Sequence, residues 1–485
     1  MTDRSRWIAL VVLCTGMLMI VLDMTIVNVA LPSIQADLGF SQSSLAWVVN
    51  AYLIAFAGLL LLAGRLGDLA GRRNVFMAGL GVFTVASLLC GLAANKEMLV
   101  AARFLQGVGG ALTSAVILGM IVTMFSDPRE QARAIGVFAF VASAGAAVGL
   151  LTGGMLTQLL NWHWIFVVNL PIGAVTAVAA RRMIGPDRGA GLRAGADVPG
   201  ALLITGAMML AVFTIVDPAA QEGWLAVKTL GLGACSLVLL GGFILRQRST
   251  RNPLMPLRIL ASRNVTGANL VQVLAAAGMF GMFFLGSLYL RQILGYDPLQ
   301  IGLAFLPVAV VMGVLSVRYT DRLVMRFGAR TTMLPGLGLI AAALALFAIA
   351  PAGGGGYLSH IFPAAILAGT GAGLSFPALM ALAMSSATPQ DAGLASGLVN
   401  TTAQVGGALG LAVLATASAS RTKTLIALHH PAAAALTGGY HLAFWIACGL
   451  VVTAAGIVVT MLHQQPALPR SPQPVPELVP AGQAR

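Results

Sequence analysis

Residues 21–32, "VLDMTIVNVALP", stand inside an apolar run that extends over residues 7–29 and contains one carboxylate, that of Asp23. A continuous run of this length can cross about 30 Å of hydrocarbon as an α-helix. A strand of a membrane barrel would instead show a segment of about ten residues that alternates in hydrophobicity. The stretch therefore predicts a membrane-spanning helix that carries an ionisable side chain.

Similar runs recur along almost the whole chain. Of its 485 residues, 58% are hydrophobic and 9% are charged, so the chain is far more apolar than a soluble globular domain. Charged residues, prolines and glycines separate the runs. This pattern predicts an all-α integral membrane protein with 14 transmembrane helices, over residues 7–29, 45–64, 75–94, 98–121, 133–156, 164–182, 199–216, 225–245, 265–287, 300–317, 331–351, 358–383, 395–418 and 440–462.

The basic residues predict the orientation in the membrane. Most of the 28 Lys and Arg residues fall in the segments that share a side with the N-terminus; the exceptions are Lys96, Lys228, Arg291, Arg421 and Lys423 in the opposite loops and Arg103 inside a helix. The positive-inside rule then places both termini in the cytoplasm. The net charge of +13 is spread over short loops beside lipid head groups, so it does not indicate nucleic-acid binding. We expect a multi-pass protein of the bacterial plasma membrane.

Two motifs indicate a family. The loop "GRLGDLAGRRNV", residues 64–75, resembles the signature between helices 2 and 3 of the major facilitator superfamily; its motif residues are Gly64, Asp68, Gly71, Arg72 and Arg73. Residues 103–111, "RFLQGVGGA", resemble the motif of helix 4 in the same superfamily. The positive-inside rule alone would explain the arginines of the loop, but it does not explain Asp68.

Further stretches narrow this resemblance to the fourteen-helix drug:proton antiporter branch. They are "LDMTIVNVALP" at 22–32, "NWHWIFVVNLPIG" at 161–173 and "FLPVAVVMG" at 305–313. Glycines at positions 145, 149, 153 and 154 have the spacing of the antiporter motif, although Leu150 stands where that motif usually has proline. A simpler interpretation of Gly145, Gly149, Gly153 and Gly154 is close helix packing, because the first three are four residues apart and share one face.

The resemblance implies a domain plan and an activity. Residues 1–182 and 263–463 would form two six-helix halves, and residues 183–262 would add two inserted helices. The loop after the tenth expected helix, "RYTDRLVMRFGAR", repeats the 64–75 motif in a degenerate form. The implied function is proton-coupled export of hydrophobic or amphipathic compounds, such as drugs or antibiotics, by alternating access. The loop 64–75 would latch the two halves on the cytoplasmic side. The proline-rich residues 464–485 predict a disordered cytoplasmic tail.

Asp23 and Arg103 are the candidates for proton coupling. At 1.5 Å per residue, Asp23 lies about 24 Å into its helix and Arg103 about 8 Å into a helix that enters from the other side, so both lie at a similar depth. A charge in lipid is expensive, so each should face the interior of the bundle. Either both are structural, or Asp23 exchanges a proton while Arg103, which keeps its own, tunes it.

The remaining candidates are weaker. Polar side chains on helix faces could contact a substrate or could only bond between helices; they are Asn28, Asn50, Gln106, Asn269, Gln272, Asn400 and Gln404. We expect no cofactor and no metal, because the six His and four Cys are dispersed and no G-x-x-x-x-G-K loop occurs. The expected partners are an amphipathic substrate, protons and lipids, with the chain as a monomer. An exporter of one natural product and an integral membrane enzyme are the alternatives.

Overall fold

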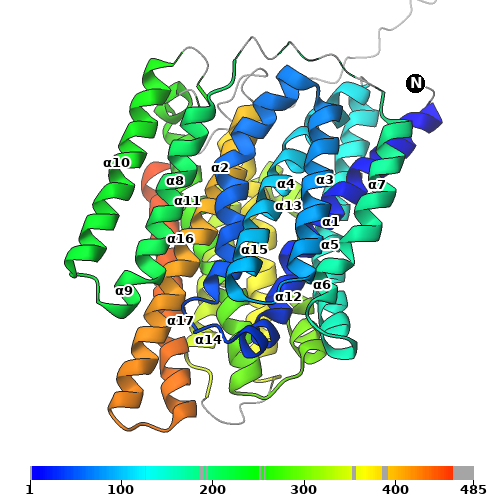
Figure 1. Ribbon diagram of the computed structural model, residues 1–485. Coiled ribbons are helices and arrows are strands. Elements are labelled where there is room, and N and C mark those ends of the chain that lie inside the picture. Colours follow the sequence, from blue (N-terminus) through cyan, green and yellow to red (C-terminus); the bar gives the residue numbers. More distant parts are fainter. Residues whose placement is uncertain are drawn as a thin grey trace, which may run out of the picture.

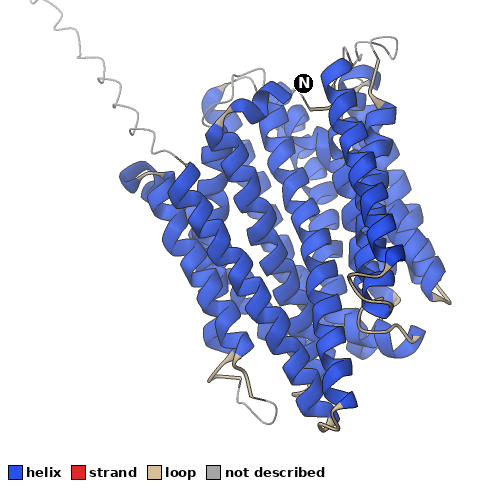
Figure 2. Cartoon of the chain, turned by 90° about the vertical axis from the view of Figure 1, so that its left-hand side faces the viewer, coloured by secondary structure: helices blue, strands red, loops and turns tan. Residues whose placement is uncertain are grey.

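The computed structural model describes residues 3–462 apart from 126, 186, 188, 190, 192–194, 251–252, 256, 352–356 and 385–391. Within these residues every regular element is a helix, and most of the helices run side by side in one bundle (Figures 1 and 2). The predicted all-α fold is confirmed. The tail expected over residues 464–485 lies outside the described residues.

The helices follow the predicted runs in order. Their bounds are α1 Asp3–Leu38, α2 Ala46–Ala70, α3 Arg72–Gly91, α4 Lys96–Met124, α5 Pro128–Leu159, α6 Trp164–Val167, α7 Asn169–Met183, α8 Val198–Val216, α9 Pro218–Gln221, α10 Val227–Ser249, η2 Leu257–Ala261, α11 Arg263–Gln292, α12 Pro298–Arg318, α13 Thr320–Phe327, α14 Ala329–Ala348, α15 Ile361–Met384, α16 Ala392–Ala427 and α17 Ala432–Met461. In the described chain, 13 helical stretches are long and apolar enough to cross a membrane. The remaining expected span is α5, whose apolar part is Ala144–Leu159.

Several helices continue beyond the apolar runs. α1 passes through Pro32 and ends at Leu38, and α16 includes Arg421 and Lys423, which the sequence had indicated for a loop. That loop assignment is wrong, and so is the assignment of residues 320–327 to a loop, because they form α13. An apolar run ends where the hydrocarbon ends, whereas a helix continues until its backbone hydrogen bonds are interrupted or capped.

Two sets of helices pack in the same order. In the first set, α1 packs on α5 and α7, and α4 packs on α2 and α3; in the second, α11 packs on α16 and α17, and α15 packs on α12 and α14. Gly71 precedes α3 with φ 92° and Gly328 precedes α14 with φ 87°, a conformation that glycine adopts without strain. The weak sequence repeat around Asp68 and Asp321 therefore has a counterpart in the backbone.

The two sets meet along two seams. α5 packs on α12 and α2 packs on α16. At the first seam the backbone is very close, since a Cβ on Gly302 would overlap the carbonyl of Leu150, and one on Gly154 would lie 2.7 Å from the Cα of Leu299. Small residues allow this close approach between helices in a membrane.

α8 and α10 form a pair at the edge of the bundle, on the left in Figure 1. α8 also packs on α2 and α16, so it covers the second seam. On one side a Cβ at Gly58 of α2 would overlap the hydroxyl of Thr205 in α8. On the other side the hydroxyl of Thr416 in α16 donates to the carbonyl of Ile215 at 3.1 Å.

Two aspartates cap helices, as expected for a cap acceptor that precedes a proline: Asp297 lies directly before Pro298 and Asp197 two residues before Pro199. Asp297 accepts a hydrogen bond from the backbone N–H of Gln300, whose side chain accepts from the N–H of Asp297, which completes a capping box at α12. Asp197 accepts from the N–H of Gly200 at the start of α8. Neither residue shares a described hydrogen-bond partner with Asp23, which lies inside α1.

Candidate functional site

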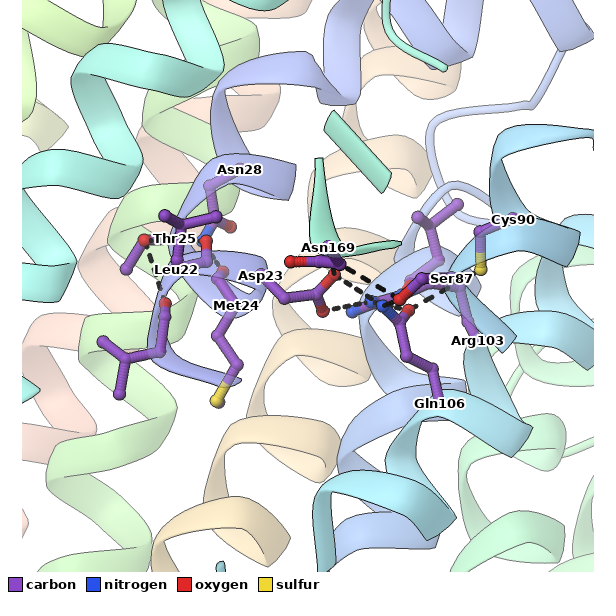
Figure 3. Close-up of polar contacts among 12 residues, drawn as sticks. Leu22, Asp23, Met24, Thr25, Asn28, Ser87, Cys90, Arg103, Gln106 and Asn169 are labelled. Carbon is purple, nitrogen blue, oxygen red and sulfur yellow. Dashed lines mark hydrogen bonds and ion pairs between the residues drawn. The ribbon is translucent and has the colours of Figure 1, made fainter. Parts of the chain in front are cut away.

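Asp23 lies in a closed cluster of polar side chains from four helices. Its Oδ2 accepts from Nη1 of Arg103 in α4 at 2.6 Å, and its Oδ1 accepts from the amide of Gln106, one turn further along α4, at 2.7 Å. The amide of Asn169 at the start of α7 donates to Oδ1 at 3.2 Å. Figure 3 shows these side chains converging on Asp23, while Thr25 and Asn28 of the same helix point away from it.

Arg103 is held on every side. Its Nε donates to the carbonyl of Val48 in α2 at 2.9 Å, and its Nη1 also donates to Oε1 of Gln106 at 2.6 Å. The guanidinium lies 4.5 Å from the ring centre of Tyr52 and 5.8 Å from that of Phe166. These contacts fix the position of the cation, and the similar depth predicted for Asp23 and Arg103 is a direct contact.

Gln106 is locked between the two charges. Its Oε1 accepts from Arg103 and from the thiol of Cys90, and its NH₂ group donates to Asp23 and to the hydroxyl of Ser87 at 2.8 Å. All four hydrogen-bonding positions of a primary amide are thus occupied. The sequence had marked Gln106 for a substrate contact; in the structure it belongs to the cluster.

Asn169 and Ser87 are members of the cluster that the sequence analysis missed. Asn169 lies within the stretch quoted for the antiporter branch, but its polarity alone does not distinguish it from Asn28 or Asn161. Only the fold brings the start of α7 and the C-terminal part of α3 beside Asp23.

The environment of this cluster is apolar. Asp23 and Gln106 are fully buried, and Arg103 is 1% exposed. Among the described residues, the only other buried charged side chain is Asp197. An ion pair in such surroundings is sensitive to anything that removes one of its charges, because the partner would remain unpaired. The arrangement can therefore couple the protonation of Asp23 to the packing of α1, α4 and α7.

Residues 64–75, which the sequence indicates as a loop, are helical except at Gly71, because α2 ends at Ala70 and α3 begins at Arg72. The loop assignment is therefore wrong in extent, and the name loop 64–75 is kept for this motif segment. Asp68 accepts from Arg72 at 3.1 Å, and Arg72 also donates to the carbonyl of Gly119 in α4 at 2.8 Å. Arg73 donates to the carbonyl of Arg181 at the end of α7 at 2.7 Å. Gly71 has a positive φ, whereas Gly64 has no neighbouring atoms within 4 Å of the position of a Cβ. None of these described contacts reaches residues 263–463.

Asp187, which the sequence analysis did not mark, caps this loop. Its carboxylate accepts from the backbone N–H groups of Arg72 at 2.5 Å and Arg73 at 3.1 Å, at the start of α3. The same segment lines a cavity of about 390 Å³ with Asp68 and both arginines. The negative charge of the Asp187 carboxylate is stabilised at the N-terminal end of α3, because the helix dipole is positive there.

The glycines of α5 pack on α1. A Cβ on Gly145 would lie 2.8 Å from the Leu18 side chain, one on Gly149 would overlap the hydroxyl of Thr25, and one on Gly153 would lie 2.7 Å from Ile26. The prediction of a shared packing face is confirmed in its geometry, and Gly154 instead faces α12. Leu150 is buried inside the α-helix at the position where the motif usually has proline.

The other polar candidates are spread over four helices. Asn28 donates to the carbonyl of Met24 in its own helix, and Asn50 is buried with no partner for its amide in the described chain. Asn269 of α11 accepts from Thr402 of α16 at 2.9 Å, so it joins two helices. Gln272 is buried, Asn400 is exposed and Oε1 of Gln404 is buried without a described partner.

The sequence model of the Major Facilitator Superfamily matches residues 13–411. The chain belongs to the Major Facilitator Superfamily. A puromycin resistance protein of Streptomyces alboniger is 41% identical over 471 residues, which cover 96% of this chain and 92% of that protein. A cephamycin export protein of Amycolatopsis lactamdurans is 40% identical over 422 residues, with 85% of both chains covered. These relatives agree with the drug:proton antiporter branch that the motifs resemble.

Solved structures of two transporters have the same fold. A bacterial homologue of the lysosomal transporter Spinster gives a TM-score of 0.70 at 15% identity and covers 95% of this chain and 97% of that one. A peptide transporter of the POT family gives 0.68 at 16% identity, with coverage of 97% and 99%. With the family match and the export and resistance proteins among its relatives, the chain is a multi-pass membrane transporter. Among the described residues, no group of three His, Cys, Asp or Glu side chains could hold a metal ion.

Proposed function

We propose that this superfamily member exports amphipathic compounds, such as antibiotics, out of the cell in exchange for protons. The relatives support export, since their names describe antibiotic resistance or export proteins of actinomycetes. The apolar bundle also suits such substrates, because flexible Met and aromatic side chains adapt to varied apolar shapes. Proton coupling is assigned to Asp23, with Arg103 as the residue that tunes it.

The observation that carries this proposal is the closed cluster around Asp23. A purely structural interior could be built without charges, since apolar residues of similar volume often stabilise a core equally well. Charged residues inside a membrane bundle mark sites of ion or substrate transfer. Asp23 is a carboxylate that can lose its charge on protonation, whereas Arg103 cannot. Export would then follow from a change in the pairing of α1 with α4 and α7.

Alternating access between two halves, residues 1–182 and 263–463, is part of the proposal. Support comes from the repeated packing order of the two helix sets. At the face opposite the N-terminus, hydrogen bonds bridge these halves: Gln292 donates to Gln35 at 2.9 Å, and Gln42 donates to Ser418 at 2.9 Å. With the N-terminal face assigned to the cytoplasm by its basic residues, the bridged face is the outer one. The loop 64–75 would latch the halves when this bridge opens.

A second candidate is export of one natural product. Several relatives are named after a single compound, among them proteins for tetracenomycin C and for methylenomycin A. A dedicated site would need fixed polar anchors, for which Asn50 and Gln404 are available because each has a buried amide atom without a described partner. Competition between unrelated compounds for transport distinguishes a broad exporter from a dedicated one.

The decisive experiment reconstitutes the protein in vesicles and measures proton movement when a candidate compound is added. Dyes, puromycin, cephamycin-type β-lactams and small metabolites are screened with a pH-sensitive probe. The wild type should move protons in response to at least one compound, and Asp23→Asn should bind that compound but no longer drive its uphill export. Uphill export by Asp23→Asn with an unchanged pH profile would place proton coupling elsewhere.

A further inference from the structure

Protonation of Asp23 creates a problem that its neighbours do not solve as they stand. Both carboxylate oxygens accept hydrogen bonds, and all the groups that bond to them are donors: the guanidinium of Arg103 and the NH₂ groups of Gln106 and Asn169. A protonated carboxyl has an O–H that must find an acceptor, because a buried donor without a partner is costly. A reversible proton site therefore needs one neighbour that can change from donor to acceptor.

Two of the three neighbours cannot make this change. Arg103 has no acceptor atom. Gln106 has one, but its Oε1 already accepts from Arg103 at 2.6 Å and from the Cys90 thiol, so rotation of its amide would direct NH₂ at a cation. The cation and the thiol together hold Gln106 in its present orientation.

Asn169 is not held in this way. Its NH₂ group donates to Asp23 at 3.2 Å and to the hydroxyl of Ser87 at 3.5 Å, while its Oδ1 is buried and has no partner among the described residues. A half turn of the amide exchanges the two ends without moving the side chain as a whole. In the observed orientation the amide oxygen has no partner, and after a half turn the NH₂ group would have none. The protonation state of Asp23, which faces the amide, therefore decides which orientation is preferred.

We propose that Asn169 is the amide switch of the proton site, a role that rests on the proposed proton coupling at Asp23. With Asp23 ionised, Asn169 donates to Oδ1 as the structure shows. When a proton binds to Oδ1 of Asp23, the amide of Asn169 rotates by a half turn. The Oδ1 atom of Asn169 then accepts a hydrogen bond from the new O–H of Asp23. The hydroxyl of Ser87, which can rotate, then donates to the same amide oxygen. Asn169 is the first residue of α7, so the amide rotates at the point where that helix packs on α1.

Among the described residues, no other charged group lies at Asp23 to take this proton. The charged or titratable side chains that interact electrostatically with Asp23 are Arg103 of α4, Tyr52 of α2 and Cys90 of α3. α5, α6, α7, α11 and α12 also pack on α1, and their described residues contribute no buried charged side chain. The Tyr52 hydroxyl is buried, lies beside Gly110 and has no hydrogen-bond partner among the described residues, so it makes no described hydrogen bond to Asp23.

The test titrates the purified full-length protein in lipid nanodiscs, without substrate, and follows the infrared band of protonated carboxyl groups. The part of the band that is missing in Asp23→Asn belongs to Asp23. In Asn169→Leu the protonated form loses its one acceptor, whereas the ionised form keeps Arg103 and Gln106. The midpoint of Asp23 protonation should therefore fall by about one pH unit. If Asn169 served only as a donor to the carboxylate, its loss would raise the midpoint instead.

Two further variants complete the experiment. Ser87→Ala is the matched control, because Ser87 bonds to the same amides but not to Asp23; its midpoint should move less than that of Asn169→Leu. Asn169→Ala replaces the leucine variant if that one does not fold, with the same expected sign. The proposal that Asn169 is the amide switch would be refuted by an unchanged or raised midpoint in the Asn169 variant, or by an equal fall of the midpoint in Ser87→Ala. A pH-dependent band that is identical in Asp23→Asn would instead refute the proton site itself.

Discussion

Asp23 and Asp197 have the same kinds of partner in two different parts of the molecule. Asp23 accepts from Arg103 and Gln106, and Asp197 accepts from Nε of Arg246 at 2.5 Å and from Gln247 at 2.7 Å. Both carboxylates are shielded from solvent, since their side chains are 0% exposed. An Asp–Arg–Gln cluster is therefore not by itself a mark of a proton site.

The two clusters differ in their third donor and in their arginine. Asp197 accepts from the backbone N–H of Gly200, which can only donate, whereas Asp23 accepts from the side-chain amide of Asn169, which can turn. The side chain of Arg246 is 40% exposed and that of Arg103 is 2% exposed. The helix start and the solvated arginine keep Asp197 ionised, and the enclosed cluster leaves Asp23 dependent on its neighbours.

The pKa of Asp197 expresses this difference. Burial alone would raise the pKa of this carboxyl, but the hydrogen bonds from Arg246, Gly200 and Gln247 and the charge of Arg246 outweigh it and hold the pKa below its usual value. Gln247 in turn accepts from the N–H of Met255 at 3.1 Å. Asp197 thus ties the start of α8 to the end of α10 and to the segment before α11.

The largest effect on stability is expected when Arg103 is replaced. Arg103→Met removes the cation and leaves Asp23 as a buried unpaired carboxylate, so the free energy of unfolding should fall by about 3–5 kcal/mol. The measurement is reversible unfolding in detergent micelles. The double variant Asp23→Asn/Arg103→Met should be more stable than the single one, because no charge is then left unpaired. Losses that simply add would show that the two side chains do not depend on each other.

The intermediate effect is expected at Asp197. Asp197→Asn removes a charge-assisted cap and should lower the free energy of unfolding by about 1–3 kcal/mol, while export per folded molecule is kept. The control is Asp297→Asn, which alters a cap with no arginine among its described partners and should cost about 1 kcal/mol or less. Unfolding and export are measured on the same preparations.

The pH dependence sharpens this prediction. Since the folded state has the lower pKa, Asp197 contributes its stability above the pKa of an unfolded aspartate, about 3.9, and loses it as the pH falls through the folded value. The difference between wild type and Asp197→Asn should therefore be full at neutral pH and shrink in acid below that value. A difference in stability that grew in acid would contradict the lowered pKa of Asp197. Loss of export in a stable Asp197→Asn protein would show that Asp197, like Asp23, is needed for transport.

The smallest effect on stability is expected at Asp68. Its ion pair with Arg72 is half exposed, so Asp68→Asn should change the free energy of unfolding by less than about 1 kcal/mol. Export should nevertheless fall, because the proposed latch needs the charge when the outer bridge opens. Full export by normally folded Asp68→Asn would refute the latch. Asp127→Asn, at the N-terminal face before α5, is a control for the loss of one surface charge.

Sequence alone predicted the all-α fold and the order of its membrane helices along the chain. Fourteen apolar runs suffice because hydrocarbon forces each spanning segment to satisfy its backbone internally as a helix. The glycine face at 145, 149 and 153 and the caps at Asp197 and Asp297 were also predictable, since they depend on spacing within one helix or on neighbours in the chain. Asp23 and Arg103 were predicted at similar depth because the rise per residue of a helix is fixed.

The tertiary structure alone decided which side chains meet. Asn169 and Ser87 are separated from Asp23 by 146 and 64 positions in the chain, and no periodicity within α3 or α7 indicates that they face α1. It also decided that Gln106 is locked by Arg103 while Asn169 is not, and that Asp187 caps α3 across 115 residues. A sequence pattern records the face of a helix, but the partner of that face depends on how the helices rotate and cross when they pack.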